Sequence, residues 1–255
     1  MIKILSGFTG PGGSTVAFNN LVNLFNDNGM DACLYGPHEW DGITCNFKKE
    51  EPSISSEDTV IYHFRMPPNV SCKKLILSCH ETELFPVRKI EGITYDAVHF
   101  VSDFQMKWHG VKGSVIPNVI TKYNPSLKLN KVAAIIGSVD VNKQVHTSIH
   151  RALKDGHDDI RVYGSMSDGR YFSDYVYPLL GNKVSYRGVS SDMQSVYDVI
   201  TDVYASSKLE CLPTIQGECI HLGINYHGLT ESMRSDKDFE FNDEVILEKW
   251  KKLLS

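Results

Sequence analysis

Short apolar runs alternate with segments of helical spacing along this chain, and the alternation begins twice. The apolar run 2–6 precedes a glycine cluster. Apolar side chains then recur at i, i+3, i+4 and i+7, at Phe18, Leu21, Val22 and Phe25. After the polar stretch 121–130, the apolar run 132–136 restarts the pattern. Strands that alternate with helices form parallel sheets covered on both faces, so we predict an α/β fold of two Rossmann-like, doubly wound domains facing a cleft, 1–120 and 121–235.

Further apolar runs are predicted strands, and helical spacing or a capping residue marks further helices. The predicted strands are 32–35, 59–63, 74–78, 97–101, 113–118, 160–163, 184–186 and 202–206. The predicted helices, besides one that begins after Ser14 as its N-cap, are 103–108, 171–180, 193–200 and 243–254. The last helix is amphipathic and no strand follows it. We therefore expect the tail 236–255 to pack on a domain that has already formed.

The first predicted strand runs into a glycine-rich turn that contains Gly7, Gly10, Gly12 and Gly13. The turn has the outline of a Walker A loop, but glycine occupies the lysine position, which disfavours an NTPase. A dinucleotide fingerprint is also disfavoured, because the glycine spacing differs and Gly-Pro-His at 36–38 follows the second strand. Two interpretations stay open. The small residues let a phosphate or a sugar approach the backbone, or the turn needs positive φ.

A histidine, His80, follows the predicted strand 74–78 by two residues. The pKa of histidine lies near neutrality, so a histidine at the carboxyl end of a strand is a candidate general base. A histidine whose ring is satisfied by a backbone carbonyl fits the position equally well. We interpret His63, at the end of the neighbouring predicted strand, as structural.

The segment 207–223 carries two carboxylates, Glu210 and Glu218, with seven residues between them and Pro213 at the break. It follows the predicted strand 202–206, so the predicted order is a strand, a loop with Glu210 and a helix start with Glu218. Ligands of open α/β sheets bind at this edge, and the N–H groups of a helix start suit a phosphate. The same pattern is expected without any ligand, if Glu210 is a surface carboxylate and Glu218 is a carboxylate that favours a helix start.

Charge and composition disfavour several other classes of protein. The net charge of −5 provides no general reason to bind nucleic acid. There is no run of 18 apolar residues and no signal-peptide core at the N-terminus, so we predict no membrane span and a cytoplasmic protein. None of the six cysteines forms a C-x-x-C pair, so we expect reduced thiols and no metal site.

The order and spacing of several short motifs resemble those of a GT-B glycosyltransferase, most closely glycosyltransferase family 4. The resemblance covers most of the chain and includes both ends of the first domain. The motifs that carry it are Gly12-Gly13 before the first helix, Val101-Ser102-Asp103, Val115-Ile-Pro-Asn118, Ile136-Gly137 through Lys143, Ser207-x-x-Glu210, Glu218 and Gly223.

This resemblance implies transfer of a sugar from a nucleotide-diphosphate sugar, with retained anomeric configuration and without a bound metal or another cofactor. It implies that Glu210 faces the sugar, Glu218 binds the ribose hydroxyls and Lys143 neutralises the leaving diphosphate. The implied donor-binding residues are Gly12, Gly13, Gly137, Ser138, Lys143, Thr214 and Glu218, and the implied catalytic residues are His80, Lys143 and Glu210. The last helix of this fold crosses back onto the first domain, and we expect the same of the tail.

The chain departs from the family pattern at two places. Ser138 stands where the family has an arginine, which removes one cation from the diphosphate site. Cys211-Leu212-Pro213 replaces glycines, and the proline lacks an N–H that could bind a phosphate. The alternatives are therefore a non-catalytic module that binds a nucleotide or a glycan, and another GT-B enzyme such as an epimerase or a sugar-phosphate synthase. The acceptor stays open among glycans, small molecules and modified bases.

Overall fold

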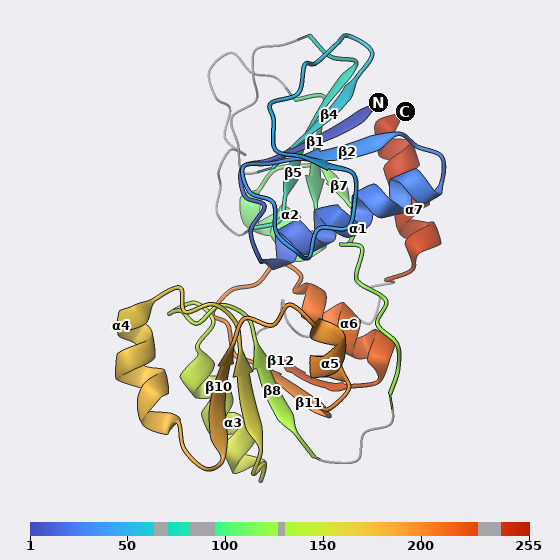
Figure 1. The fold of residues 1–255 in the computed structure, drawn as a ribbon. Helices are drawn as coiled ribbons and strands as arrows, with labels where there is room; N and C mark the ends of the chain where they lie inside the picture. Colours follow the sequence, from blue (N-terminus) through green and yellow to red (C-terminus); the bar gives the residue numbers. More distant parts are fainter. Residues whose placement is uncertain (64–70, 82–94, 127–130, 229–240) are drawn as a thin grey trace. The chain divides into compact units, whose positions relative to one another are not determined.

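The computed structural model describes residues 1–63, 71–81, 95–126, 131–228 and 241–255 (Figure 1). The chain divides into two compact units. Unit 1 comprises Met1–Thr121 and Asp238–Ser255, and unit 2 comprises Lys122–Lys237. Residues 127–130 of the predicted linker and residues 236–240 of the predicted tail lie outside the described residues.

Unit 1 is built on a parallel sheet. Seven of its strands are described, in the order β3-β2-β1-β4-β5-β6-β7. They are β1 (Ile2–Ser6), β2 (Ala32–Tyr35), β3 (Phe47–Lys48), β4 (Thr59–His63), β5 (Lys74–Cys79), β6 (Ala97–Phe100) and β7 (Ser114–Val115). The described helices are α1 (Gly13–Asp27), α2 (Asp103–His109) and α7 (Asp243–Leu254). The strand order reverses between β1 and β4, so the carboxyl ends of these strands form the topological switch point.

Both faces of the first sheet are buried, which explains why its strands are apolar at successive positions. In β1, Ile4 belongs to the core that α1 and α7 cover. The next residue, Leu5, packs on the opposite face with Tyr35 and Tyr62. A strand with one exposed face would instead alternate apolar and polar residues.

The C-terminal helix α7 lies beside α1 and contributes to the same core (Figure 1). The indole of Trp250 is 1% exposed and packs edge-on against Phe25, with ring centroids 5.9 Å apart. The imidazole of His99 lies 4.6 Å from the same indole. The side chain of Asn242 caps the helix by accepting the Glu244 N–H at 2.9 Å. The tail is thus an integral part of unit 1.

A buried ion pair makes unit 1 sensitive to acid. The carboxylate of Asp58 lies 2.7 Å from Lys3 Nζ and also accepts the Ser55 N–H at 2.8 Å. Burial by itself would raise the pKa of Asp58, but the hydrogen bonds from Lys3 and Ser55 outweigh burial and lower the pKa to about 2 from the ordinary value of 3.8.

Acidification is therefore expected to remove stability that depends on Asp58. The folded pKa lies below the unfolded one, so the contribution of about 2 kcal/mol is complete above the unfolded pKa and is lost as the pH falls from about 4 to about 2. Urea unfolding of the wild type and of Asp58→Asn between about pH 6 and pH 2.5 measures this loss. The variant should be less stable at pH 6 and should lose less stability on acidification. Equal losses in the two proteins would contradict this assignment.

Unit 2 contains a second parallel sheet, in which five strands are described in the order β10-β9-β8-β11-β12. They are β8 (Ala133–Ile136), β9 (Ile160–Tyr163), β10 (Val184–Gly188), β11 (Asp202–Ala205) and β12 (Asn225–Gly228). The described helices are α3 (Val145–Lys154), α4 (Gly169–Tyr171), α5 (Met193–Tyr197) and α6 (Thr214–Leu222). The strand order again reverses, between β8 and β11, and the predicted doubly wound fold is confirmed for both units.

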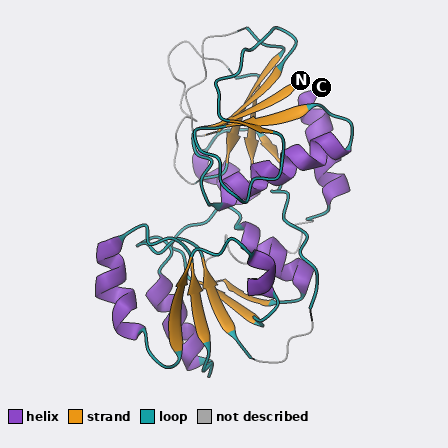
Figure 2. Cartoon of the chain, viewed as in Figure 1, coloured by secondary structure: helices purple, strands orange, loops and turns teal. Residues whose placement is uncertain are grey.

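Helices cover both faces of the second sheet (Figure 2). Ile135 in β8 and Val162 in β9 pack in one core with α3. Ala134, next to Ile135 in β8, packs in another core with residues of α5 and α6. The carboxyl ends of β8 and β11 are therefore left as the open edge at which loops carry polar side chains.

Several local features of the structure differ from the predictions. The first helix begins at Gly13 with Gly12 as its N-cap, and Ser14 does not cap it. The predicted helix 171–180 is a composite of α4, a π-helical turn η1 (Phe172–Val176) and a 3₁₀ turn η2 (Tyr177–Leu179). Pro178 within η2 has no N–H to donate, which disfavours a continued α-helix. The strands β3 and β12 were not predicted, because β3 has two residues and β12 is largely polar.

Candidate functional site

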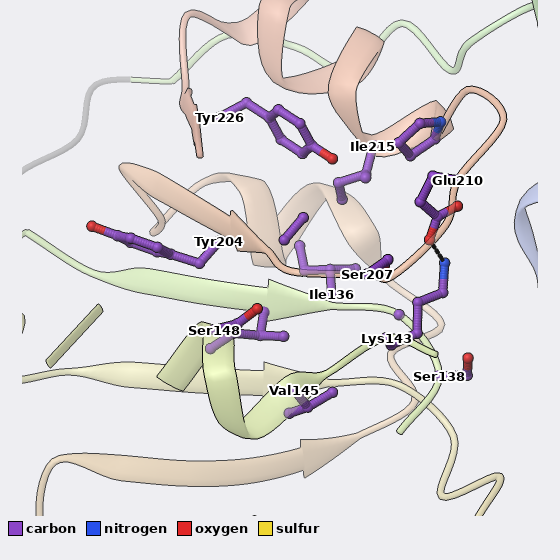
Figure 3. A pocket seen from close by; sticks show the side chains of 14 residues that line it. Ile136, Ser138, Lys143, Val145, Ser148, Tyr204, Ser207, Glu210, Ile215 and Tyr226 are labelled. Carbon is purple, nitrogen blue, oxygen red and sulfur yellow. Dashed lines mark hydrogen bonds and ion pairs between the residues drawn. The ribbon is translucent and has the colours of Figure 1, made fainter. Parts of the chain in front are cut away.

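A pocket of unit 2 lies at the switch point of its sheet, beside the carboxyl ends of β8 and β11 (Figure 3). Its volume is about 350 Å³, including space that is open to solvent. Its lining comes from β8, the loop after β8, α3, β11, the loop after β11, the start of α6 and β12. It comprises Ile135, Ile136, Gly137, Ser138, Lys143, Val145, Ser148, Tyr204, Ala205, Ser207, Glu210, Pro213, Ile215 and Tyr226. Open α/β sheets bind ligands at this place.

Two glycines shape the turn that leaves β8. Gly137 and Gly164 both have φ in the region that favours glycine, at +145° and +143°. A Cβ atom on Gly164 would lie 1.8 Å from the carbonyl oxygen of Gly137, so the turns that follow β8 and β9 are in contact backbone to backbone. Gly137 also donates its N–H to the Tyr163 carbonyl at 3.0 Å. This close approach requires glycine and brings the backbone of the β8 turn to the pocket wall.

Asp140 organises the loop between β8 and α3. Its carboxylate accepts the Ser138 hydroxyl at 2.5 Å and the Lys143 N–H at 2.9 Å. The Ser138 hydroxyl therefore donates a hydrogen bond within the loop. The family that the chain resembles has a cation at this position. Sequence reasoning missed Asp140. The signal that could have revealed it is an acidic residue three positions before the lysine, which suits an N–H at a helix start.

Lys143 and Glu210 form an ion pair at the mouth of the pocket, where the two side chains extend toward one another from different loops (Figure 3). The Lys143 side chain is 31% exposed and that of Glu210 is 15% exposed. Two further hydrogen bonds hold the two loops together. Lys208 N–H donates to the Asn142 carbonyl at 2.8 Å, and Asn142 Nδ2 donates to the Leu209 carbonyl at 3.2 Å. The structure thus brings together two predicted site residues that are 67 positions apart.

Two buried hydroxyl groups line the pocket without a hydrogen-bond partner among the described residues. They are Ser148 Oγ, on α3, and the phenol oxygen of Tyr226, on β12. Burial raises the pKa of Tyr226, which keeps the phenol protonated and able to donate. Buried polar groups are normally hydrogen-bonded. These two hydroxyls therefore indicate that the pocket is suited to a polar ligand or to ordered water. Neither residue was identified from the sequence, since nothing local marks them.

Glu218 lies elsewhere in unit 2. The prediction that it sits at a helix start is wrong, because α6 begins directly after Pro213 and Glu218 is its fifth residue. Its side chain is buried and accepts a hydrogen bond from the Tyr197 hydroxyl. Burial raises the pKa of Tyr197 well above its ordinary value, and the Glu218 carboxylate raises it further. Glu218 does not line the pocket, and Thr214, the first residue of α6, stands between two residues that do.

The predicted residues Gly12 and Gly13 belong to unit 1. None of the four glycines in the first turn has φ in the left-handed region, so the interpretation as a turn that needs positive φ is wrong. The ring of Phe8 lies over the turn instead. A Cβ atom added to Gly10 would lie 3.0 Å from this ring, and one added to Gly12 would lie 3.3 Å from it. These glycines leave room for a close approach, and in this structure the approaching group is the Phe8 ring.

His80 also belongs to unit 1, directly after β5. Its ring packs 4.4 Å from Phe18, 5.2 Å from His63 and 5.8 Å from His99. His80 Nε2 lies 3.2 Å from Ser78 Oγ, and the buried Nδ1 has no hydrogen-bond partner among the described residues. Burial lowers the pKa of His80 well below its ordinary value, and His63 and His99 lower it further. A neutral ring of such low basicity is better suited to hydrogen bonding than to general-base catalysis.

Neither a protein-family model nor a curated protein matches the chain. Several solved structures are similar in fold. AviGT4, a glycosyltransferase involved in avilamycin A biosynthesis, is 15% identical, with coverage of 89% of this chain and 78% of AviGT4 and a TM-score of 0.67. WaaG, a glycosyltransferase involved in lipopolysaccharide biosynthesis, is 13% identical, with coverage of 100% and 90% and a TM-score of 0.64.

A third similar structure is an α-glucosyltransferase in complex with UDP and a 13-mer DNA that contains an HMU base. It is 12% identical, with coverage of 99% of this chain and 89% of that protein and a TM-score of 0.59. Among the described residues, no helix combines the length and apolar character that crossing a bilayer requires. The two parallel sheets, their strand orders and these neighbours together show that the chain has the Rossmann-like two-domain fold of GT-B glycosyltransferases.

Proposed function

We propose that the chain transfers a sugar from a nucleoside-diphosphate sugar to an acceptor, and that the unit 2 pocket binds the donor. The observation that carries the proposal is the Lys143–Glu210 pair at the switch-point pocket of a glycosyltransferase fold. A diphosphate needs a cation, and the hydroxyl groups of a sugar need an acceptor of hydrogen bonds. The pair offers both at one place. Neighbours of the same fold include a structure described as a complex with UDP and glucose.

In the proposed reaction, the diphosphate takes the place of Glu210 beside the ammonium of Lys143. Glu210 is then released to accept hydrogen bonds from the sugar. The turn at Gly137–Ser138 approaches the phosphates with its backbone, and Lys143 stabilises the negative charge that develops on the leaving diphosphate. Retained anomeric configuration and independence of a metal follow from the family 4 resemblance and are part of the proposal.

Two further residues of unit 2 complete the proposed donor site. Glu218 binds the ribose hydroxyls, and a ribose would compete for its carboxylate with the Tyr197 hydroxyl. Thr214 contributes from the start of α6, beside pocket residues Pro213 and Ile215. In unit 1, the neutral ring of His80 suits a hydrogen bond to a sugar or an acceptor better than proton abstraction.

A binding module without turnover is a second candidate, favoured by the charges of the site. Of the described residues that line the pocket, Lys143 is the one cation, and Glu210 offsets it. Ser138 stands where the family that the chain resembles has an arginine, and its partner Asp140 adds a carboxylate. A site with so little positive charge stabilises a leaving diphosphate weakly.

A thermal-shift panel is expected to show the donor site. UDP, GDP, ADP, CDP, dTDP and their glucose conjugates are added to the wild type, and at least one should raise the unfolding temperature. A nucleotide concentration of about 100 times Kd raises the free energy of unfolding by about 2.7 kcal/mol. Release of the nucleoside diphosphate from the conjugate that binds then separates an enzyme from a binding module. If no nucleotide stabilises the protein, the proposed donor site is wrong.

A further inference from the structure

The carboxylate of Glu81 is held at the ligand edge of the first sheet by a chain of hydrogen bonds. Glu81 Oε2 lies 2.8 Å from His63 Nε2, and His63 Nδ1 lies 2.9 Å from Ser6 Oγ. Ser6 and His63 end β1 and β4, the strands between which the strand order reverses. Both are almost fully buried, at 0% and 1% exposure, so the ring that donates to Glu81 has little freedom to move.

The main chain of Glu81 is fixed independently by α2. Gln105 Nε2 donates to the Glu81 carbonyl at 2.8 Å, and His109 Nε2 lies 3.2 Å from the same oxygen. Gln105 is itself fully buried, and its Oε1 accepts the Val101 N–H at 2.8 Å. Hydrogen bonds from β4 and α2 thus fix both the side chain and the backbone of this residue.

This degree of order is more than the buried histidine requires. The His63 N–H needs one acceptor, which a neutral amide or a backbone carbonyl would also supply. The side chain of Glu81 is 38% exposed, and its Oε1 has no partner among the described residues. Ordering a glutamate side chain costs rotamer entropy, which half-exposed surface carboxylates normally avoid. A rigid, half-exposed carboxylate is instead the arrangement that binding sites use.

The surroundings of Glu81 indicate the chemistry of its ligand. The described partner of the Glu81 carboxylate is the His63 imidazole, which itself contacts the Ser6 hydroxyl and the neutral His80 ring. In the described part of the chain, no lysine or arginine pairs with this carboxylate. A phosphate or carboxylate would be repelled here. A hydroxyl group donates to a carboxylate without bringing charge into the site, and such charge-assisted hydrogen bonds are among the strong ones.

We propose that Glu81 binds the acceptor, with Oε1 accepting a hydrogen bond from a hydroxyl of a neutral sugar or polyol, and that His63 is its positioning residue. This inference rests on the proposed transfer reaction only in identifying the ligand at Glu81 as the acceptor. Binding of a polyhydroxylated ligand at this edge is measurable without a donor.

The test uses ligand-observed NMR with glycerol, myo-inositol, methyl α-D-glucopyranoside and sucrose as probes, each with the full chain. Glu81→Gln keeps an oxygen that accepts the His63 N–H and loses the charge, so it should fold like the wild type and bind at least one probe about 10- to 100-fold more weakly. Glu57→Gln, at an exposed glutamate of the same unit, is the matched control and should bind like the wild type.

The possible results separate cleanly. Weaker binding by Glu81→Gln, with the same thermal stability and the same nucleotide shift as the wild type, supports the assignment. The assignment is overturned if no probe binds the wild type, if Glu81→Gln binds as well as the wild type, or if ethanolamine binds through Glu81 while the polyols do not. A missing nucleotide shift in all variants would count against the donor site alone, because the polyol measurement uses no donor.

Discussion

Replacing Lys143 with methionine is expected to lower donor turnover about 100- to 1,000-fold, the effect typical of losing one group that stabilises developing charge. Methionine keeps most of the length of the side chain and removes the ammonium. The substitution also leaves Glu210, which is 15% exposed, without its cation at the mouth of the pocket. Nucleoside-diphosphate affinity should therefore fall as well, because a carboxylate that is no longer neutralised repels the diphosphate.

A double variant tests whether both effects are present. Lys143→Met combined with Glu210→Gln removes the uncompensated carboxylate, so nucleotide affinity by thermal shift should recover in part. Turnover should not recover, because the cation is still missing. Lys208→Met is the control, since Lys208 is exposed in the same loop as Glu210 and does not line the pocket. Wild-type turnover in Lys143→Met would overturn the role assigned to the ammonium.

Truncating Trp250 to alanine is expected to lower the free energy of unfolding of unit 1 by about 3–5 kcal/mol. The indole is 1% exposed and packs against Phe25 on α1 and His99 on β6, so its removal leaves a cavity where α7 meets the rest of the unit. A loss of this size is a large fraction of the stability of a typical domain.

Urea unfolding followed by circular dichroism measures the effect. Unit 2 is followed separately, by the rise in unfolding temperature that a bound nucleotide produces. Trp108→Ala serves as the control, because the Trp108 side chain is 55% exposed and its loss should change the stability little. The two units are expected to unfold in separate steps, and only the step that belongs to unit 1 should move. A change below about 1 kcal/mol for Trp250→Ala would show that α7 contributes little to the core.

Much of the fold was predictable because its signals are local. Strands buried on both faces read as continuous apolar runs, and β1, β4 and β5 were found for that reason. The capping side chain of Ser102 was found because an N-cap acts on residues two or three positions away. The two-residue strand β3 and the polar strand β12 escaped prediction because pairing with a neighbour, and not their own composition, makes them strands.

The candidate site was predictable only in part. The sequence indicated Lys143 and Glu210 through their places after two strands, and the resemblance supplied their roles. That they form an ion pair is a tertiary result, because they are separated by 67 positions and meet only where β8 and β11 are neighbours. Glu218 shows the reverse. Its position in the motif did not reveal that α6 would turn its carboxylate toward Tyr197.

The sequence alone determined that this chain forms two doubly wound α/β units, since apolar periodicity and glycine turns act over a few residues. Tertiary structure alone decided which polar groups meet. Glu81 depends on Ser6, His63, Gln105 and His109, which lie between 18 and 75 positions away. Ser6 and His63 end two parallel strands that bring their carboxyl ends to one edge, and Gln105 and His109 lie on α2. The physical reason is that a hydrogen bond depends on distances of about 3 Å in space, which spacing along a chain does not encode until the sheet order is known.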